Sequence, residues 1–404
     1  AALRFLGLDG HLGYETELLR SMLSTASGKH VTVDSALQLS AVFSCVSLIS
    51  ETVSTLPLKI YQRKADGSRD VAVMHPLYNV LCRSPNYEMT PSRFMLMIVA
   101  SICLWGNSYV EIIRTASGRV ISLNPLLPQN MVITRDKVTK FLKYSYTESG
   151  QKREISEKNM MHIRGFGIDG VMGLFKVQKA RETIGAAQAA EEAAAKFFEN
   201  GLQTSGLLSA EGKLTPDQRE AIRVNMGKFM GSKNSGKLLV LENGMQYHGI
   251  TMNPEAAQML ETRTFEIEEI CRWFRVPPFM VGHLNKQSSW ASSTEGMNMQ
   301  FLTNTLRPML VNIEQEIARC LIGVAESEKY YVEFGVEGLL RADSKGRAEY
   351  YASALDHGWY NRNEVRRKEN EAPIPGGDIY TIQSALIPLD KVGTNYKGDK
   401  NEQT

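Results

Sequence analysis

The sequence has few cysteines, no long hydrophobic run and almost no net charge, and each of these absences excludes a class of protein. Its 404 residues include five cysteines without any C-x-x-C spacing, which argues against a disulfide framework or a zinc site and favours a reducing compartment. The most apolar run, residues 94–105, is too short to span a bilayer and predicts a buried helix. Residues 1–30 carry charges and glycines throughout, unlike a signal peptide. The net charge of +2 excludes a strongly basic DNA-binding protein, so contact with DNA requires local patches or repetition around an oligomer.

Residue patterns typical of catalysis or metal binding are also missing. His162, His248 and His283 have no helical i, i+4 partner and no acidic residues at ligand spacing. The G-x-S-x-G element of serine hydrolases is absent. We therefore predict no catalytic residue, no metal and no cofactor.

One segment resembles a phosphate-binding loop. Gly231 to Lys237 match its first seven positions, but the eighth, which must be serine or threonine to hold magnesium, is Leu238. A true loop of this kind follows a strand and opens a helix, whereas here a predicted helix comes first. A simple turn is favoured. A nucleotide-dependent DNA-processing enzyme using Gly231 to Lys237 remains an alternative, which ATP binding that is lost in Lys237→Ala would support.

The first part of the chain predicts an α+β fold. Residues 1–32 lack periodicity and predict an irregular arm. Helical periodicity then covers 33–54, apolar alternation predicts a strand over 58–62, and Thr90-Pro91 predicts the start of a helix that ends at Gly106. Short strands follow up to residue 163.

The middle of the chain predicts long helices around a small separate unit. Residues 177–200 are rich in alanine, the best helix former, which also permits close approach of a second helix. Residues 202–251 predict a strand, a helix from about Pro216, and two further strands joined at Asn243-Gly244. Since residues 254–274 predict another long helix, the small unit is expected to project from a helical shaft.

A polar loop separates this helix from a longer amphipathic one. The loop has little to bury, and its candidate functional residues are Asn285, Lys286, Gln287, Ser288, Ser289, Trp290, Ser292 and Ser293. It is either a plain surface connection or a functional loop, in which Lys286 touches phosphates and Trp290 packs on a partner loop or a sugar. Pro308 lies inside the following helix and predicts a kink near Asn304.

The last part of the chain is shorter and more polar. It predicts a strand over 330–334 and helices over 343–357 and 363–370. Residues past 389 predict a disordered tail.

Six short segments together carry a resemblance to a known family. They are residues 40–46 (SAVFSCV), 56–61 (LPLKIY), 105–110 (WGNSYV), 260–263 (LETR), 274–278 (FRVPP) and 305–308 (TLRP). In this order and spacing, they resemble the portal proteins of tailed double-stranded DNA bacteriophages of the siphovirus type. The resemblance covers about residues 31–389.

The resemblance implies an α+β portal fold that forms rings, with a wing, a two-helix stem, an α/β clip, a tunnel loop and helix, and a small crown. Its parts would be an arm (1–32), the wing (33–176), the first stem helix (177–200), the clip (201–251), the second stem helix (252–283), the tunnel loop and kinked helix (284–323), the wing return strand and crown (324–389) and the tail (390–404).

The same resemblance implies a function. The chain would form a dodecameric ring at one capsid vertex, with rings of about thirteen possible in isolation. Terminase would package double-stranded DNA through its channel without sequence specificity, and the DNA would leave by the same route. The partners implied are the terminase large subunit, the major capsid protein and the head–tail connector, in the virion and, during assembly, in the host cytoplasm, with no membrane. Clip residues expected to dock terminase or connector are Lys213, Arg219, Arg223, Lys228, Lys233 and Asn243.

A protein of another class remains an alternative. A non-viral scaffold with coiled helices would share the helical periodicity but would pass no DNA. Closed rings with a central hole, seen by electron microscopy, would exclude it.

Overall fold

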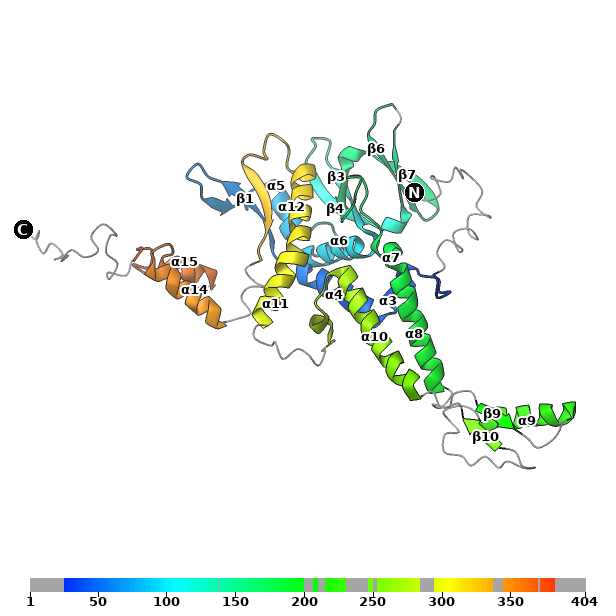
Figure 1. Ribbon diagram of the computed structural model, residues 1–404. Helices are drawn as coiled ribbons and strands as arrows, with labels where there is room; N and C mark the ends of the chain where they lie inside the picture. The colour runs from blue at the N-terminus through cyan, green and yellow to red at the C-terminus, as the bar shows by residue number, and fades with distance from the viewer. Residues whose placement is uncertain are drawn as a thin grey trace, which may run out of the picture. The chain divides into compact units, whose positions relative to one another are not determined.

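The computed structural model describes residues 25–136, 138–199, 206–209, 215–229, 246–249, 253–283, 294–336, 344–369 and 371–381 (Figure 1). The chain divides into two compact units, residues 1–335 and 336–404. Helices and antiparallel strands are mixed in the first unit, so the predicted α+β fold is confirmed. Among the described residues, no helix has both the length and the apolarity needed to cross a membrane.

Two packed helices form the centre of the first unit. Helix α6 (Pro91–Trp105) begins where Thr90 accepts a hydrogen bond from the Arg93 amide, and it ends where Gly106 adopts a left-handed φ of 73°. Its apolar side chains are buried against α4 (Ser40–Ser54), which confirms the buried helix predicted over 94–105.

The single helix predicted over 33–54 is wrong. Helix α3 (Val33–Leu37) ends before Leu39, which is extended with φ −73° and ψ 123°, and α4 starts anew at Ser40. No glycine or proline marks this break. The Leu39 side chain is buried, so core packing, which local periodicity does not report, accounts for the interruption.

The described residues of this unit include three antiparallel sheets of three strands each. The first has the order β11-β1-β2, with β1 (Leu58–Arg63), β2 (Arg69–Val71) and β11 (Tyr330–Phe334), and helix α5 (Pro76–Cys82) packs on β1. The second has the order β4-β3-β8, with β3 (Asn107–Arg114), β4 (Val120–Leu126) and β8 (Met160–Arg164). The third is β5 (Met131–Arg135), β6 (Leu142–Glu148) and β7 (Gln151–Ile155). Short 3-10 turns lie at Pro128–Asn130 and Glu157–Asn159. The strands predicted over 58–62, 330–334 and up to residue 163 are confirmed.

Two long helices, α8 (Arg181–Glu199) and α10 (Asn253–Phe274), run side by side (Figure 1). The helix predicted over 177–200 is divided into α7 (Lys176–Lys179) and α8 at Ala180, which is buried and has ψ 6°. Between the two long helices in sequence, β9 (Gly206–Ser209) pairs antiparallel with β10 (Gln246–Gly249), and α9 (Pro216–Phe229) lies between them along the chain. The strand predicted over 237–241, the turn at Asn243-Gly244 and the segment Gly231 to Leu238 lie outside the described residues.

The helix predicted after the polar loop has three parts. They are α11 (Thr294–Phe301), a π-helical turn (Leu302–Leu306) and α12 (Arg307–Leu321). Helix α12 packs on β8 and β11 through a buried stripe made of Leu310, Ile313, Ile317 and Leu321.

The described residues of the second unit form the helices α14 (Ser344–Asp356) and α15 (Arg362–Lys368). Asn361 and Glu364 form a reciprocal capping box at the start of α15. Gly358 has a φ of 72° just after α14, as its position after the predicted helix suggests.

Candidate functional site

The sequence-predicted site residues fall into two groups. The loop residues Asn285, Lys286, Gln287, Ser288, Ser289, Trp290, Ser292 and Ser293 lie outside the described residues, as do Lys213, Lys233 and Asn243. Helix α9 contains Arg219, Arg223 and Lys228 in its sequence, and Arg219 is exposed.

The chain entering the polar loop is folded back on α10. Arg275, directly after α10, has a φ of 56°, and the Val276 amide donates to the Cys271 carbonyl over 3.0 Å. A 3-10 turn, η4 (Pro278–Val281), follows and ends at Gly282, which has a left-handed φ of 79°. His283 Nε2 then lies 3.7 Å from the Glu268 carboxylate of α10. The segment therefore reverses direction before the loop begins.

The chain leaving the loop is tied to the same place. The Thr305 hydroxyl, in the π-helical turn, donates a 2.6 Å hydrogen bond to the Arg275 carbonyl. Pro308 has no amide to donate to the carbonyl of Asn304, and the π-helical turn stands where this missing bond predicts a distortion. Sequence analysis identified Pro308 but missed Thr305, because a hydroxyl inside an amphipathic helix gives no signal of a bond to a residue thirty positions away.

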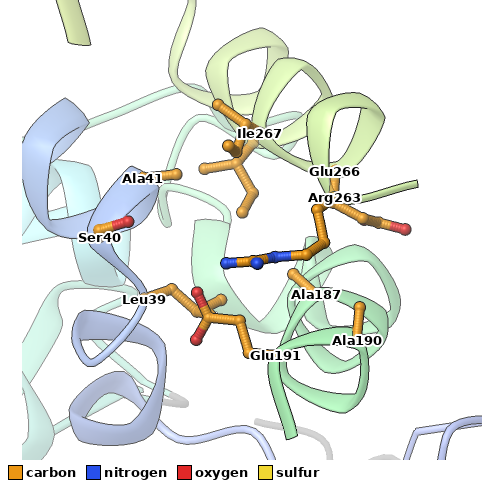
Figure 2. A pocket seen from close by; sticks show the side chains of 10 residues that line it. Leu39, Ser40, Ala41, Ala187, Ala190, Glu191, Arg263, Glu266 and Ile267 are labelled. Carbon is orange, nitrogen blue, oxygen red and sulfur yellow. The ribbon is translucent and has the colours of Figure 1, made fainter. Parts of the chain in front are cut away.

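The two long helices join the rest of the unit around a small cavity of about 60 Å³ (Figure 2). Ala187 and Ala190 of α8 leave this space open, and the Arg263 side chain of α10 extends across it between α8 and the start of α4. Ligand pockets measure about 300–1,000 Å³, so this cavity is too small for an organic substrate. The cavity lies where α8 and α10 meet the start of α4.

A buried polar network fixes the chain between the second sheet and α7. Asn107 bonds His162 Nε2 over 3.0 Å, accepts from the Gly173 amide over 2.8 Å and donates to the Gly173 carbonyl over 2.9 Å. The Gly165 amide donates to the Gly106 carbonyl over 2.7 Å. Residues 165–174 are therefore held against the start of β3.

Helix α12 is attached to the same region by polar contacts. Asn312 donates to the Arg164 carbonyl, and Glu316 contacts the guanidinium groups of Arg164 and Arg319. The Arg164 Nε donates to the Val171 carbonyl over 3.0 Å. One arginine therefore connects α12, which follows the polar loop, to the segment that leads into α7 and α8.

The model of the phage portal protein family matches residues 40–370. The chain belongs to the phage portal protein family. The portal protein of Enterobacteria phage HK97 is 35% identical over 367 residues, which cover 90% of this chain and 86% of that protein.

Solved structures share the fold of this portal protein. The neck of an empty gene transfer agent (GTA) particle, computed with C6 symmetry, has a TM-score of 0.61 at 21% identity and covers 91% of this chain and 96% of its own. The neck of a native GTA particle, computed with C12 symmetry, has a TM-score of 0.59 at 21% identity with the same coverage of both chains. The predicted portal fold is thus confirmed.

The family is structural rather than enzymatic. Within the described ranges, no group of three or more histidine, cysteine, aspartate or glutamate side chains is arranged to hold a metal ion.

Acid is expected to destabilise the portal protein through His162. Burial, with smaller contributions from Arg164 and Arg319, lowers the pKa of His162 from 6.5 to about 3. Below pH 6.5, His162 is protonated in the unfolded chain but stays neutral in the folded chain. The free energy of unfolding therefore falls as the pH drops from 6.5 towards 3. The loss is about 1.4 kcal/mol per pH unit, which urea unfolding at pH 7 and pH 5 would measure. His162→Gln does not titrate and should lose less stability over this interval; an equal loss in both proteins would contradict the assignment.

Proposed function

We propose that this portal protein assembles into a dodecameric ring through which double-stranded DNA is packaged and ejected. The observation that carries the proposal is the pair of long helices, α8 and α10, followed by a polar loop whose two ends are tied together by Thr305 and Arg275. A closed ring repeats such a loop around one axis. The necks with C6 and C12 symmetry that share the fold support this arrangement.

The proposed parts follow the predicted boundaries. Residues 33–176 form the wing, 177–200 and 252–283 the stem helices, 201–251 the clip, and 284–323 the tunnel loop and its helix. The wing return strand and a small crown occupy 324–389, between an N-terminal arm (1–32) and a tail (390–404). The division of the helix over 177–200 at Ala180 makes α7 the link between wing and stem.

Charge supports a channel in which DNA slides. Each phosphate that a protein neutralises adds to affinity, so a strongly basic lining would hold DNA in place. The net charge of +2 and the hydroxyl and amide side chains of residues 285–293 would keep the channel from binding DNA tightly. Twelvefold repetition would still turn Lys286 into a ring of positive charge.

The proposed partners bind other parts of the ring. The clip, with Arg219, Arg223 and Lys228 on α9, would dock the terminase large subunit and later the head–tail connector. The wing would contact the major capsid protein. Since Leu238 replaces the magnesium-binding hydroxyl of a phosphate-binding loop, we propose that the chain itself has no nucleotide-dependent activity.

Electron microscopy of the purified chain tests the proposal. We expect closed rings of about twelve or thirteen subunits with a central hole, because a heterologous interface whose rotation divides a full turn closes into a ring. Mass photometry of the same sample would give the ring mass independently. A stable monomer, an open filament or a filled particle would contradict the proposal.

A further inference from the structure

An open groove of about 370 Å³ lies between α5 and β4, far in sequence from the loop and clip. Its rim carries Arg83, at the end of α5, and Arg119, directly before β4. Both side chains are exposed, and no aspartate or glutamate lines the groove. The positive charges of Arg83 and Arg119 are therefore not neutralised by any acidic residue that lines the groove.

The two guanidinium groups are available to a partner. Within the part of the chain that the structure describes, neither forms an ion pair or a hydrogen bond, and the one aromatic contact of Arg83 is to Tyr78 at 5.8 Å from the ring centroid. Arginines elsewhere on these sheets are engaged, as Arg153 is with Glu111 over 2.6 Å and 2.8 Å. A planar guanidinium with free donors favours a carboxylate, which it can bind through two parallel hydrogen bonds.

The groove also has an apolar side. Val80 and Val120 are buried at its base, while the Ile121 side chain is 52% exposed. Ile121 lies at an irregularity of the β3–β4 ladder, because Ser122 pairs with Ile113 and Val120 with Arg114. A ligand here would contact an aliphatic surface between two positive charges, which a nucleic-acid backbone does not need.

One edge of β4 borders the groove. Strand β4 is terminal in the order β4-β3-β8, and its outer edge is covered at Leu123, where the Leu123 amide donates to the Pro85 carbonyl over 2.8 Å and Asn86 donates to the Leu123 carbonyl over 3.0 Å. Towards Val120, no strand of the described residues pairs with this edge. An extended peptide lying along an uncovered edge gains backbone hydrogen bonds and places alternate side chains into neighbouring pockets.

We propose that the groove between α5 and β4 binds an extended acidic segment of another protein, in which carboxylates flank an aliphatic side chain. The carboxylates pair with Arg83 and Arg119, and the aliphatic side chain packs on Ile121. The proposal adds a binding site that neither the channel nor clip docking requires, and it holds whether or not DNA passes through a ring.

Fluorescence anisotropy with the purified full-length protein tests this site. The probe is a fluorescein-labelled peptide of alternating glutamate and leucine, with a lysine–leucine peptide and a short DNA duplex as comparison probes. We expect the acidic peptide to bind and its affinity to fall as salt is added. The affinity should be at least about tenfold lower for the double variant Arg83→Glu, Arg119→Glu. Arg93→Glu, the same charge change at an exposed position on α6, is the matched control and should bind normally.

A second variant tests the apolar contact. Ile121→Ser should weaken binding of the glutamate–leucine peptide but leave binding of a glutamate–serine peptide unchanged. Size-exclusion chromatography and thermal melting of each variant show that its fold and assembly are intact. The proposal is overturned if the acidic peptide does not bind the parent protein, or if Arg93→Glu reduces binding as much as the double variant does. It is overturned equally if the duplex is the tighter ligand, or if the double variant changes the assembly state, which would make the groove a contact between copies of this chain.

Discussion

Gly173→Ala is expected to destabilise the portal protein by at least about 3 kcal/mol. A Cβ at Gly173 would overlap the Gly106 carbonyl, and a Cβ at Gly106 would overlap the Leu174 carbonyl. Both obstacles are backbone atoms and cannot rotate away. The overlap would also push Gly173 away from Asn107, which bonds both its amide and its carbonyl. Two breaks in a buried network then add to the steric cost.

Urea unfolding followed by circular dichroism measures this effect. Gly323→Ala is the matched control, because nothing lies within 4 Å of its Cβ position and its backbone conformation does not require glycine. The control should remain within about 1 kcal/mol of the parent protein. Equal stability of Gly173→Ala and Gly323→Ala would show that the segment of residues 165–174 is not held against β3 as described.

Lys286→Glu is expected to reduce packaged DNA at least about tenfold while leaving assembly unchanged. This prediction rests on the proposed channel. In a ring of about twelve subunits, the substitution replaces a ring of positive charges by a ring of negative ones facing the phosphates. Lys286 lies outside the described residues, but the residues on either side of its segment are fixed to each other by Thr305 and Arg275. A change of charge within the segment should therefore leave the fold around it intact.

The measurement is nuclease-protected DNA per particle in cells that supply the other head and packaging proteins. Lys286→Gln, which removes the charge without reversing it, should fall between the parent protein and Lys286→Glu. Lys59→Glu makes the same charge change at an exposed position on β1 and should package normally. If Lys286→Glu packages as well as Lys59→Glu, residues 285–293 do not face the DNA.

Features encoded by neighbouring residues were predictable from the sequence. Thr90, Pro91 and Gly106 mark both ends of α6 because capping needs only the residues at the cap itself. The breaks at Leu39 and Ala180 were not predictable, since both residue types suit a helix; both side chains are buried in the core. Local propensity yields to tertiary packing at such positions.

The candidate site divides in the same way. Pro308 indicated a distortion because its missing amide acts within one helical turn, and a π-helical turn stands there. The contacts of Thr305 with Arg275, of Asn107 with Gly173 and of Arg164 with Glu316 join residues far apart in sequence. Neither the periodicity nor the spacing of residues in one sequence predicts such contacts. The groove at Arg83 and Arg119 was missed for the same reason.

The pairing of β1 with β11 sets a time order on synthesis. Leu58 lies opposite Phe334, so the first sheet cannot be completed until the ribosome has made nearly all of the first unit. Until then β1 keeps an open edge, and α12 can pack on β8 but not on β11. An open strand edge can pair with another chain, so the unfinished chain is more prone to aggregation than the finished one.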